Sequence, residues 1–216
     1  MADYSLLCCV VNMGVASHVL KAAKKLGVQG GTIFIGRGTI HNRFLEFLKI
    51  NEERKEIVTM IVECEMAAGV LKGIAEHMRF DKPHHGIAFS LPVTEFTGHK
   101  NPVDKKAGCV EMKDSGHKII YVVVERGMAE DVVESANKAG ARGGTVLNAR
   151  GAGIHEAKKL FSVEIEPEKE EVFIIVKTEE KDSIINSIKK DLKIDEPGNG
   201  IIFVMDINEV YGLHES

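Results

Sequence analysis

Short apolar runs and amphipathic stretches follow one another in the same order in both halves of the chain. Residues 6–11 and 119–124 are apolar at nearly every position, which is typical of strands in the buried centre of a sheet. Each run is followed by apolar positions at helical spacing, namely Val15, Val19, Ala22, Ala23 and Leu26, then Met128, Val132, Ser135, Ala136 and Ala139. Gly27 and Gly140 follow, where a glycine commonly ends a helix.

The remaining segments complete the same pattern in each half. Strands are predicted at 32–35, 57–62 and 86–91, and at 145–149, 172–176 and 200–205. A second helix carries Val70, Leu71, Ile74 and Met78, and its counterpart carries Ile184, Ile185, Ile188 and Leu192. The order β-α-β-loop-β-α-β predicts an α+β fold of two tandem ferredoxin-like (βαββαβ) domains, each an antiparallel sheet with helices on one face.

The two halves are also similar residue by residue. The segment Gly30-Gly31-Thr32-Ile33 recurs as Gly143-Gly144-Thr145-Val146, a shift of 113, and Arg37-Gly38 recurs as Arg150-Gly151. One residue is then inserted, and the shift stays at 114 from Ile40-His41 and Ile154-His155 to Gly98 and Gly212. We therefore predict a first domain at 1–98, a linker at 99–116 and a second domain at 117–216.

The central strands are apolar on both faces, although the helices of one domain cover only one face of its sheet. An uncovered apolar face favours aggregation. We therefore expect these faces to pack against other copies of the domain, in the same chain or a neighbouring one.

Composition excludes several classes of protein. The 216 residues are 44% hydrophobic and 28% charged with a net charge of -4, which is typical of a globular protein and gives no basic surface for nucleic acid. No apolar run reaches the roughly 18 residues that cross a membrane, and no secretory signal is visible, so a cytoplasmic protein is expected. The four cysteines show no CxxC spacing and are expected to be reduced.

The order of the repeated motifs resembles the PII (nitrogen regulatory) family of trimeric signalling proteins. The family has a Gly-x-Thr-Val second strand, a long loop that docks on partners and a glycine-rich turn before its fourth strand. Here the long loops correspond to 39–53 and 152–170, and the turns lead into Gly86-Ile87-Ala88-Phe89 and Gly200-Ile201-Ile202-Phe203. Leu91-Pro92-Val93 and Thr97-Gly98 are similar to the segment that follows.

The resemblance implies a regulator that is not an enzyme. Such a protein binds a small effector in clefts between domains, with ATP, ADP or AMP as candidates, and its long loops control a partner enzyme or transporter, with nitrogen metabolism as the implied setting. It also implies a homo-oligomer with threefold or pseudo-threefold packing. The ligand-binding candidates are Gly31, Thr32, Arg37, Gly38, His41, His84, His85, Gly86, Gly144, Thr145, Arg150, Gly151, His155, Gly198, Asn199 and Gly200.

The chain departs from the family pattern at the phosphate contacts. Ile87 and Ile201 replace the lysine of Gly-Lys-Ile-Phe. The arginines of the family's Arg-x-Arg-Thr-Gly segment are also missing, and Phe96-Thr97-Gly98 and Val210-Tyr211-Gly212 stand there. Neither long loop has a counterpart of the tyrosine that some members uridylylate. Backbone amides of the glycine turns remain available to bind an anion.

Other readings of these motifs stay open. Arg37 and Arg150 either hold an anion or cap a strand end, and His84-His85 are either ligands or exposed turn residues. The apolar segment 44–50 either docks a partner or folds back on the protein, and the acidic run 164–171 is interpreted as a solvated loop and strand edge. No catalytic set and no metal-ligand spacing is found. Two alternatives stay open: a trimeric metal-binding protein like CutA, which shares the fold, and an enzyme that uses the cleft.

Overall fold

The computed structural model describes residues 4–40, 52–93, 115–150, 158–160, 163–165 and 168–213. The chain divides into two compact units. Unit 1 comprises Met1–Phe34, Lys55–His117 and Asp206–Ser216, and unit 2 comprises Ile35–Arg54 and Lys118–Met205. Each unit therefore combines most of one repeat with a short segment of the other. The repeat boundaries at 98 and 117 stay a prediction.

Unit 1 contains an antiparallel sheet with two helices. Its elements are β1 (Tyr4–Asn12), α1 (Ala16–Lys25), the start of β2 (Thr32–Ile40), most of β3 (Glu52–Glu63), α3 (Cys64–Met78), β4 (Ile87–Val93) and β11 (Glu209–Tyr211). The strand order is β2-β3-β1-β4-β11. β1 pairs antiparallel with β3 and β4, and β11, which comes from the second repeat, pairs antiparallel with the outer edge of β4.

Unit 2 repeats this arrangement with a different segment at one edge. Its elements are β5 (His117–Glu125), α4 (Ala129–Lys138), β6 (Gly143–Arg150), β9 (Glu168–Lys177), α5 (Lys181–Leu192) and β10 (Ile201–Asp206). The strand order is β10-β5-β9-β6-β2. The last residues of β2 pair antiparallel with β6, from Gly36 opposite Leu147 to Ile40 opposite Gly143.

The long loop of the second repeat contains two short strands that the sequence pattern did not predict. β7 (Lys158–Leu160) pairs antiparallel with β8 (Val163–Ile165) in a separate two-stranded sheet. The third strands begin earlier than predicted, at Glu52 and Glu168 rather than near 57 and 172, because their polar first residues extend the ladder beyond the apolar core. The apolar segment 44–50 of the first long loop lies outside the described residues.

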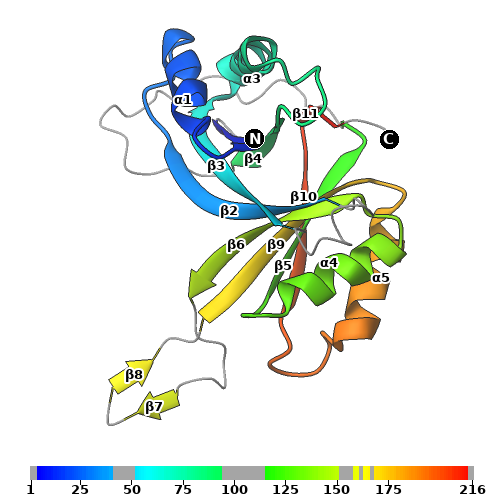
Figure 1. The fold of residues 1–216 in the computed structure, drawn as a ribbon. Coiled ribbons are helices and arrows are strands. Elements are labelled where there is room, and N and C mark those ends of the chain that lie inside the picture. Colours follow the sequence, from blue (N-terminus) through cyan, green and yellow to red (C-terminus); the bar gives the residue numbers. More distant parts are fainter. Residues whose placement is uncertain are drawn as a thin grey trace. The chain divides into compact units, whose positions relative to one another are not determined.

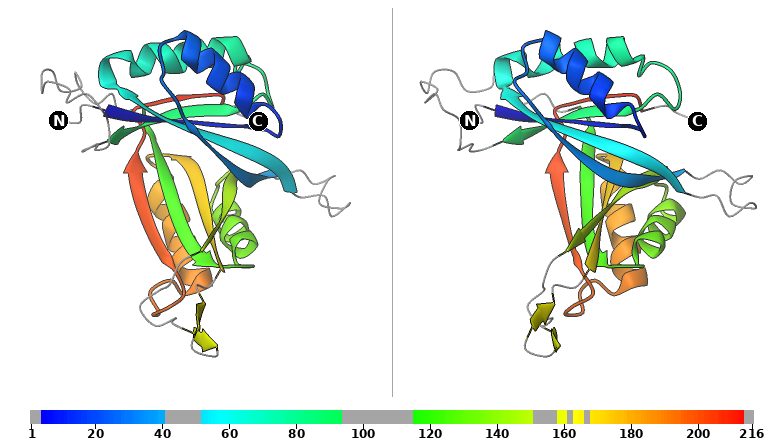
Figure 2. Two further views of the ribbon diagram at one scale, coloured as in Figure 1. Left: turned by 90° about the vertical axis from the view of Figure 1, so that its left-hand side faces the viewer. Right: turned by 60° about the vertical axis from the view of Figure 1, so that its left-hand side comes forward.

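Both helices of each unit cover the same face of its sheet, which confirms the α+β, βαββαβ prediction (Figures 1 and 2). In unit 1, Leu7, Cys9 and Val11 of β1 pack against the apolar faces of α1 and α3. In unit 2 their repeat equivalents, Ile120, Val122 and Val124, pack in the same way with α4 and α5. These alternate positions of the central strands form the two cores.

The first helix of each repeat ends as predicted but begins in an unexpected way. Gly27 (φ 94°) and Gly140 (φ 107°) adopt the left-handed conformation that glycine tolerates. Neither α1 nor α4 has a side-chain cap from its own N-cap residue. A glutamate from the neighbouring third strand caps each helix instead, Glu56 in the first repeat and Glu170 in the second.

The cysteines only partly match the prediction of reduced thiols. Cys8 and Cys9 are free and buried, and burial raises the pKa of Cys8 to about 12. Burial also raises the pKa of Cys9, with a further contribution from Cys8. Cys64, by contrast, is disulfide-bonded, so the prediction was wrong for this residue. None of the helices in the described ranges is long and apolar enough to cross a membrane.

Candidate functional site

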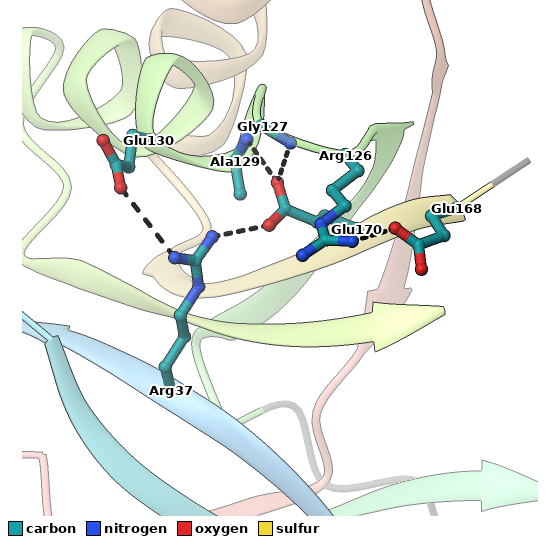
Figure 3. A network of polar contacts seen from close by, with 7 residues as sticks. All are labelled: Arg37, Arg126, Gly127, Ala129, Glu130, Glu168 and Glu170. Carbon is teal, nitrogen blue, oxygen red and sulfur yellow. Dashed lines mark hydrogen bonds and ion pairs between the residues drawn. The ribbon is translucent and has the colours of Figure 1, made fainter. Parts of the chain in front are cut away.

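Arg37 of β2 lies at the centre of a polar network in unit 2 (Figure 3). Its Nη2 donates to Oε1 of Glu170 on β9 at 2.6 Å, and its Nη1 lies 3.8 Å from Oε1 of Glu130 on α4. The Arg37 side chain is only 22% exposed. The sequence candidate for an anion-binding arginine is therefore held in a short, charge-assisted hydrogen bond within the protein.

Glu170 is the residue that organises this network. It is 4% exposed, and its second oxygen, Oε2, accepts hydrogen bonds from the backbone N–H groups of Gly127 and Ala129 at 2.9 and 3.0 Å. These amides lie at the N-terminus of α4, where unsatisfied N–H groups and the helix dipole favour a negative charge. Glu170 thus occupies the position that an external anion would take at this helix.

The interpretation of the acidic run as a solvated loop and strand edge was wrong for Glu170. It holds for its neighbour Glu168, whose side chain is about half exposed and pairs with the exposed Arg126. This contact raises the pKa of Arg126, chiefly through the hydrogen bond from its guanidinium to Glu168. The shift of 114 relates Glu170 to Glu56, which caps the equivalent helix in unit 1, but both cap contacts are visible only in the structure.

Four of the predicted site residues lie along the ladder between β2 and β6 in unit 2, namely Arg37, Gly38, Gly144 and Thr145. Gly38 lies opposite Thr145, and Thr39 lies opposite Gly144. Thr39 Oγ1 accepts from the N–H of Gly144 at 2.9 Å and donates to its carbonyl oxygen at 3.1 Å. Arg37 is directly adjacent to this contact. Gly31 and Thr32, by contrast, belong to unit 1 and are exposed.

The turns before β4 and β10 have the same backbone structure. In unit 1, the backbone N–H groups of Lys82 and His85 donate to the carbonyl oxygens of Arg79 and Lys82, respectively. In unit 2, the equivalent residues at a shift of 114 form the same two bonds. Gly86 (φ 137°) and Gly200 (φ 131°) close the turns, and a Cβ would lie 2.8 and 2.5 Å from the backbone oxygens of Val10 and Val123. Only glycine fits at these two positions.

His85 and Asn199 perform the same task in these turns. The His85 ring Nδ1 lies 3.2 Å from the carbonyl oxygen of Met78, and Asn199 Nδ2 donates to the carbonyl oxygens of Leu192 and Lys193. Met78 and Leu192 are the last residues of α3 and α5, so both side chains satisfy helix C-terminal carbonyls. This contact supports a structural role for His85.

His84 and Gly198 also occupy equivalent positions. Both have positive φ, 65° for His84 and 95° for Gly198, so the first repeat places a histidine where the second uses glycine. Arg150 is exposed at the end of β6, opposite Glu168 in the ladder with β9. His41, Gly151 and His155 lie outside the described residues, and a ligand-binding role for the whole set stays a prediction.

A metal centre finds no support in the described ranges. No group of three or more histidine, cysteine, aspartate or glutamate residues there could hold a metal ion. His84 and His85 are exposed in their turn, and no further ligand type gathers around them in that part of the chain.

Comparisons with known proteins identify the second repeat. The family model described as nitrogen regulatory protein P-II matches residues 117–216. The chain is similar to the Bacillus subtilis GlnK–ATP complex, at 24% identity over 44% of this chain and 93% of that one, with a TM-score of 0.35. It is similar to Arabidopsis thaliana PII bound to citrate, at 29% identity over 43% and 75% of the chains, with a TM-score of 0.32.

No curated protein sequence matches the chain. P-II proteins are non-enzymatic regulators that generally form trimers. The first repeat has the same order of strands and helices as the second, and both have the same glycine turn. Residues 117–216 are therefore a domain of the nitrogen regulatory protein P-II family, preceded by a first repeat with the same βαββαβ topology.

Proposed function

We propose that this chain is a tandem P-II-type regulator that binds a small effector in clefts between P-II-type domains and controls a partner enzyme or transporter through its long loops. The observation that carries the proposal is the match of residues 117–216 to the P-II family. An adenine nucleotide is the leading effector, and nitrogen metabolism is the proposed setting. Binding at one place that alters contacts at another is allostery in the two-site sense.

The turn before the fourth strand supports this proposal. It is built in the same way in both repeats, with Gly86 and Gly200 in conformations that other residues rarely adopt. Turns of this kind present backbone N–H groups that can bind an anion without a charged side chain. Since isoleucine replaces the family lysine in both turns, we expect phosphate binding to depend on these amides and on an arginine outside the turn.

The two arginine candidates are not equivalent. Arg37 is engaged by the buried carboxylate of Glu170, so a ligand would have to compete with a charge-assisted hydrogen bond. Arg150 is exposed and can contact a ligand without breaking such a bond. We therefore assign the phosphate-contacting role to Arg150, and a structural role to Arg37 in the absence of ligand.

A thermal-shift screen with ATP, ADP, AMP, cyclic nucleotides, 2-oxoglutarate and bicarbonate tests the proposal. We expect at least one adenine nucleotide to raise the melting temperature, because a ligand that binds only the folded state stabilises it. Arg150→Ala should abolish most of that shift, while Arg142→Ala, which removes an exposed arginine from the same unit, should preserve it. The absence of a shift with every nucleotide would contradict the proposal.

A further inference from the structure

The first helices of the two repeats carry opposite charge. α1 of unit 1 contains three lysines, Lys21, Lys24 and Lys25, and no acidic residue. α4 of unit 2, its equivalent at a shift of 113, contains three acidic residues and a single lysine. Both helices pack on the core of their unit through the same apolar positions, so the fold itself does not require this difference.

The charges of α4 have partners within unit 2. Glu134 pairs with Lys138 at 3.0 Å, and Glu130 lies 3.8 Å from the guanidinium of Arg37. The three lysines of α1, by contrast, form no ion pair and no side-chain hydrogen bond within the described part of the chain. Their positive charge is therefore not neutralised by any described residue.

Helix stability accounts for only part of this basic face. Lys24 and Lys25 lie in the last turn of α1, where a cation complements the helix dipole. Lys21 lies one turn earlier, three and four residues before the other two, where like charges on a helix repel one another. An anionic group bound at this face would relieve that repulsion.

The lysines lie on the side of α1 that faces away from the sheet (Figures 1 and 2). Ser17, Leu20, Lys21, Lys24 and Lys25 line a hollow of about 580 Å³ that is open to solvent. This volume is within the range of roughly 300–1,000 Å³ that is typical of ligand pockets. Leu20 is partly exposed there, and lysine side chains have apolar stems below their charged ends. The hollow thus combines an apolar floor with a cationic rim.

An occupant of this hollow must offer carboxylates to the lysines and an apolar group to Leu20. A peptide segment with acidic and apolar side chains offers both, and one of its side chains can enter a concave surface that a flat lipid surface cannot fill. The whole chain has a net charge of -4, so an acidic segment is attracted locally to this helix rather than to the protein as a whole.

We propose that the outer face of α1, formed by Ser17, Leu20, Lys21, Lys24 and Lys25, docks an acidic peptide segment of a partner protein. The proposal goes beyond the proposed function, since it requires neither an effector nor the long loops. Carboxylates of the segment pair with the lysines, and an apolar side chain packs over Leu20. Docking is confined to the first repeat, because the acidic α4 repels the same segment.

Fluorescence anisotropy of labelled peptides mixed with the full chain tests the proposal. The probe is a short peptide of glutamates around one central leucine, and two control peptides replace the leucine with serine or every glutamate with glutamine. We expect saturable binding of the probe that weakens as salt is raised. The serine peptide should bind at least about threefold more weakly and the glutamine peptide at least about tenfold more weakly, because each lacks one of the two recognised groups.

Charge reversal identifies the surface that binds the probe. Lys21→Glu combined with Lys24→Glu should weaken binding of the probe at least about tenfold and create binding to the matching lysine peptide. Lys138→Glu combined with Lys190→Glu is the matched control, because it makes the same change in net charge at exposed sites in the last turns of α4 and α5. It should leave binding of the probe within about twofold of the wild-type value. Circular dichroism verifies that both double variants keep the fold.

Three results would overturn the proposal: no binding of the probe, equal binding of the glutamate and glutamine peptides, or equal weakening by the two double variants. Binding of the chain to phosphatidylserine vesicles without binding of the probe would also overturn it, and would identify an anionic membrane as the occupant. Nucleotide titration of the same proteins separates this proposal from the effector role. The Lys21→Glu, Lys24→Glu variant should bind nucleotide as the wild type does, and a chain that binds the probe but no nucleotide contradicts only the effector role.

Discussion

Removal of the Glu170 carboxylate is the most direct perturbation of the network in unit 2. Glu170 is buried and accepts three hydrogen bonds, one each from the N–H groups of Gly127 and Ala129 at the N-terminus of α4 and one from Arg37. Glu170→Ala leaves a partly buried guanidinium and two helix amides without this partner. Breaking a buried ion pair by removing one member costs about 3–5 kcal/mol, so we expect the free energy of unfolding of unit 2 to fall by about that amount.

Arg37→Ala should cost less than Glu170→Ala. The carboxylate then keeps both amide hydrogen bonds and loses only the one from the guanidinium, which corresponds to about 1.5–3 kcal/mol for a bond between charged groups. The double variant should be less destabilised than the sum of the two single variants, because both report the same contact. Glu168→Ala is the matched control, since it removes a half-exposed carboxylate two residues away on the same strand.

Urea denaturation followed by circular dichroism gives the free energies of unfolding. Hydrogen exchange of peptides that cover residues 126–133 locates the effect, because the amides of Gly127 and Ala129 should lose protection in Glu170→Ala. Equal losses of stability in Glu170→Ala and Glu168→Ala, or unchanged exchange at the start of α4, would refute the reasoning that Glu170 organises this site.

Three further predictions follow from the turns and the buried thiols. Gly86→Ala and Gly200→Ala should each lower the free energy of unfolding by at least about 2 kcal/mol, because φ is positive and the added Cβ meets a backbone oxygen. Gly69→Ala, at an exposed position of helix α3, should raise it by about 0.5–1 kcal/mol in the same denaturation assay. His85→Asn should preserve thermal stability within about 0.5 kcal/mol, because Asn199 makes the equivalent contact, and a larger loss in a melting experiment would show that the imidazole has another role. Cys8 and Cys9 should resist alkylation in the folded protein, and rapid labelling of the native state detected by mass spectrometry would contradict this. The free energy of unfolding should be fully retained below pH 9 and fall above it by about 1.4 kcal/mol per pH unit per thiol, because only the unfolded state has ionised thiols in that range.

The element order and the cores could be predicted from the sequence because they depend on local periodicity. Leu7, Cys9 and Val11 alternate along a strand, and Val70 and Ile74 lie one helical turn apart, so each pattern identifies a buried face without knowledge of the partner. The repeat added independent support, since Gly86 and Gly200 close the same turn. These features required no information about contacts between distant segments.

The exchange of edge segments could not be predicted in this way. β11 belongs to the second repeat by sequence and pairs with β4 in unit 1, and the end of β2 pairs with β6 in unit 2. Nothing in the local pattern of either segment specifies its partner. Glu170 was misassigned for the same reason: a run of glutamates reads as a solvated strand edge until Arg37 and the start of α4 are placed around one of them.

The arrangement also changes the interpretation of the arginine candidates. Sequence comparison treats Arg37 and Arg150 as equivalent, but in the structure one is in a hydrogen bond with a buried carboxylate and the other is exposed. The two copies of the motif therefore differ in structure: the first holds a contact within unit 2, and the second is exposed.

Calorimetric titration of the chain with ATP tests the central claim, that this is an effector-binding P-II-type regulator, most directly. We expect saturable binding of ATP to the wild-type chain and to Arg142→Ala. Arg150→Ala should bind ATP about tenfold more weakly or worse, which corresponds to the loss of a charge-assisted hydrogen bond of roughly 1.5 kcal/mol or more. No measurable binding of ATP at millimolar concentration, with the same result for ADP and AMP, would contradict the account.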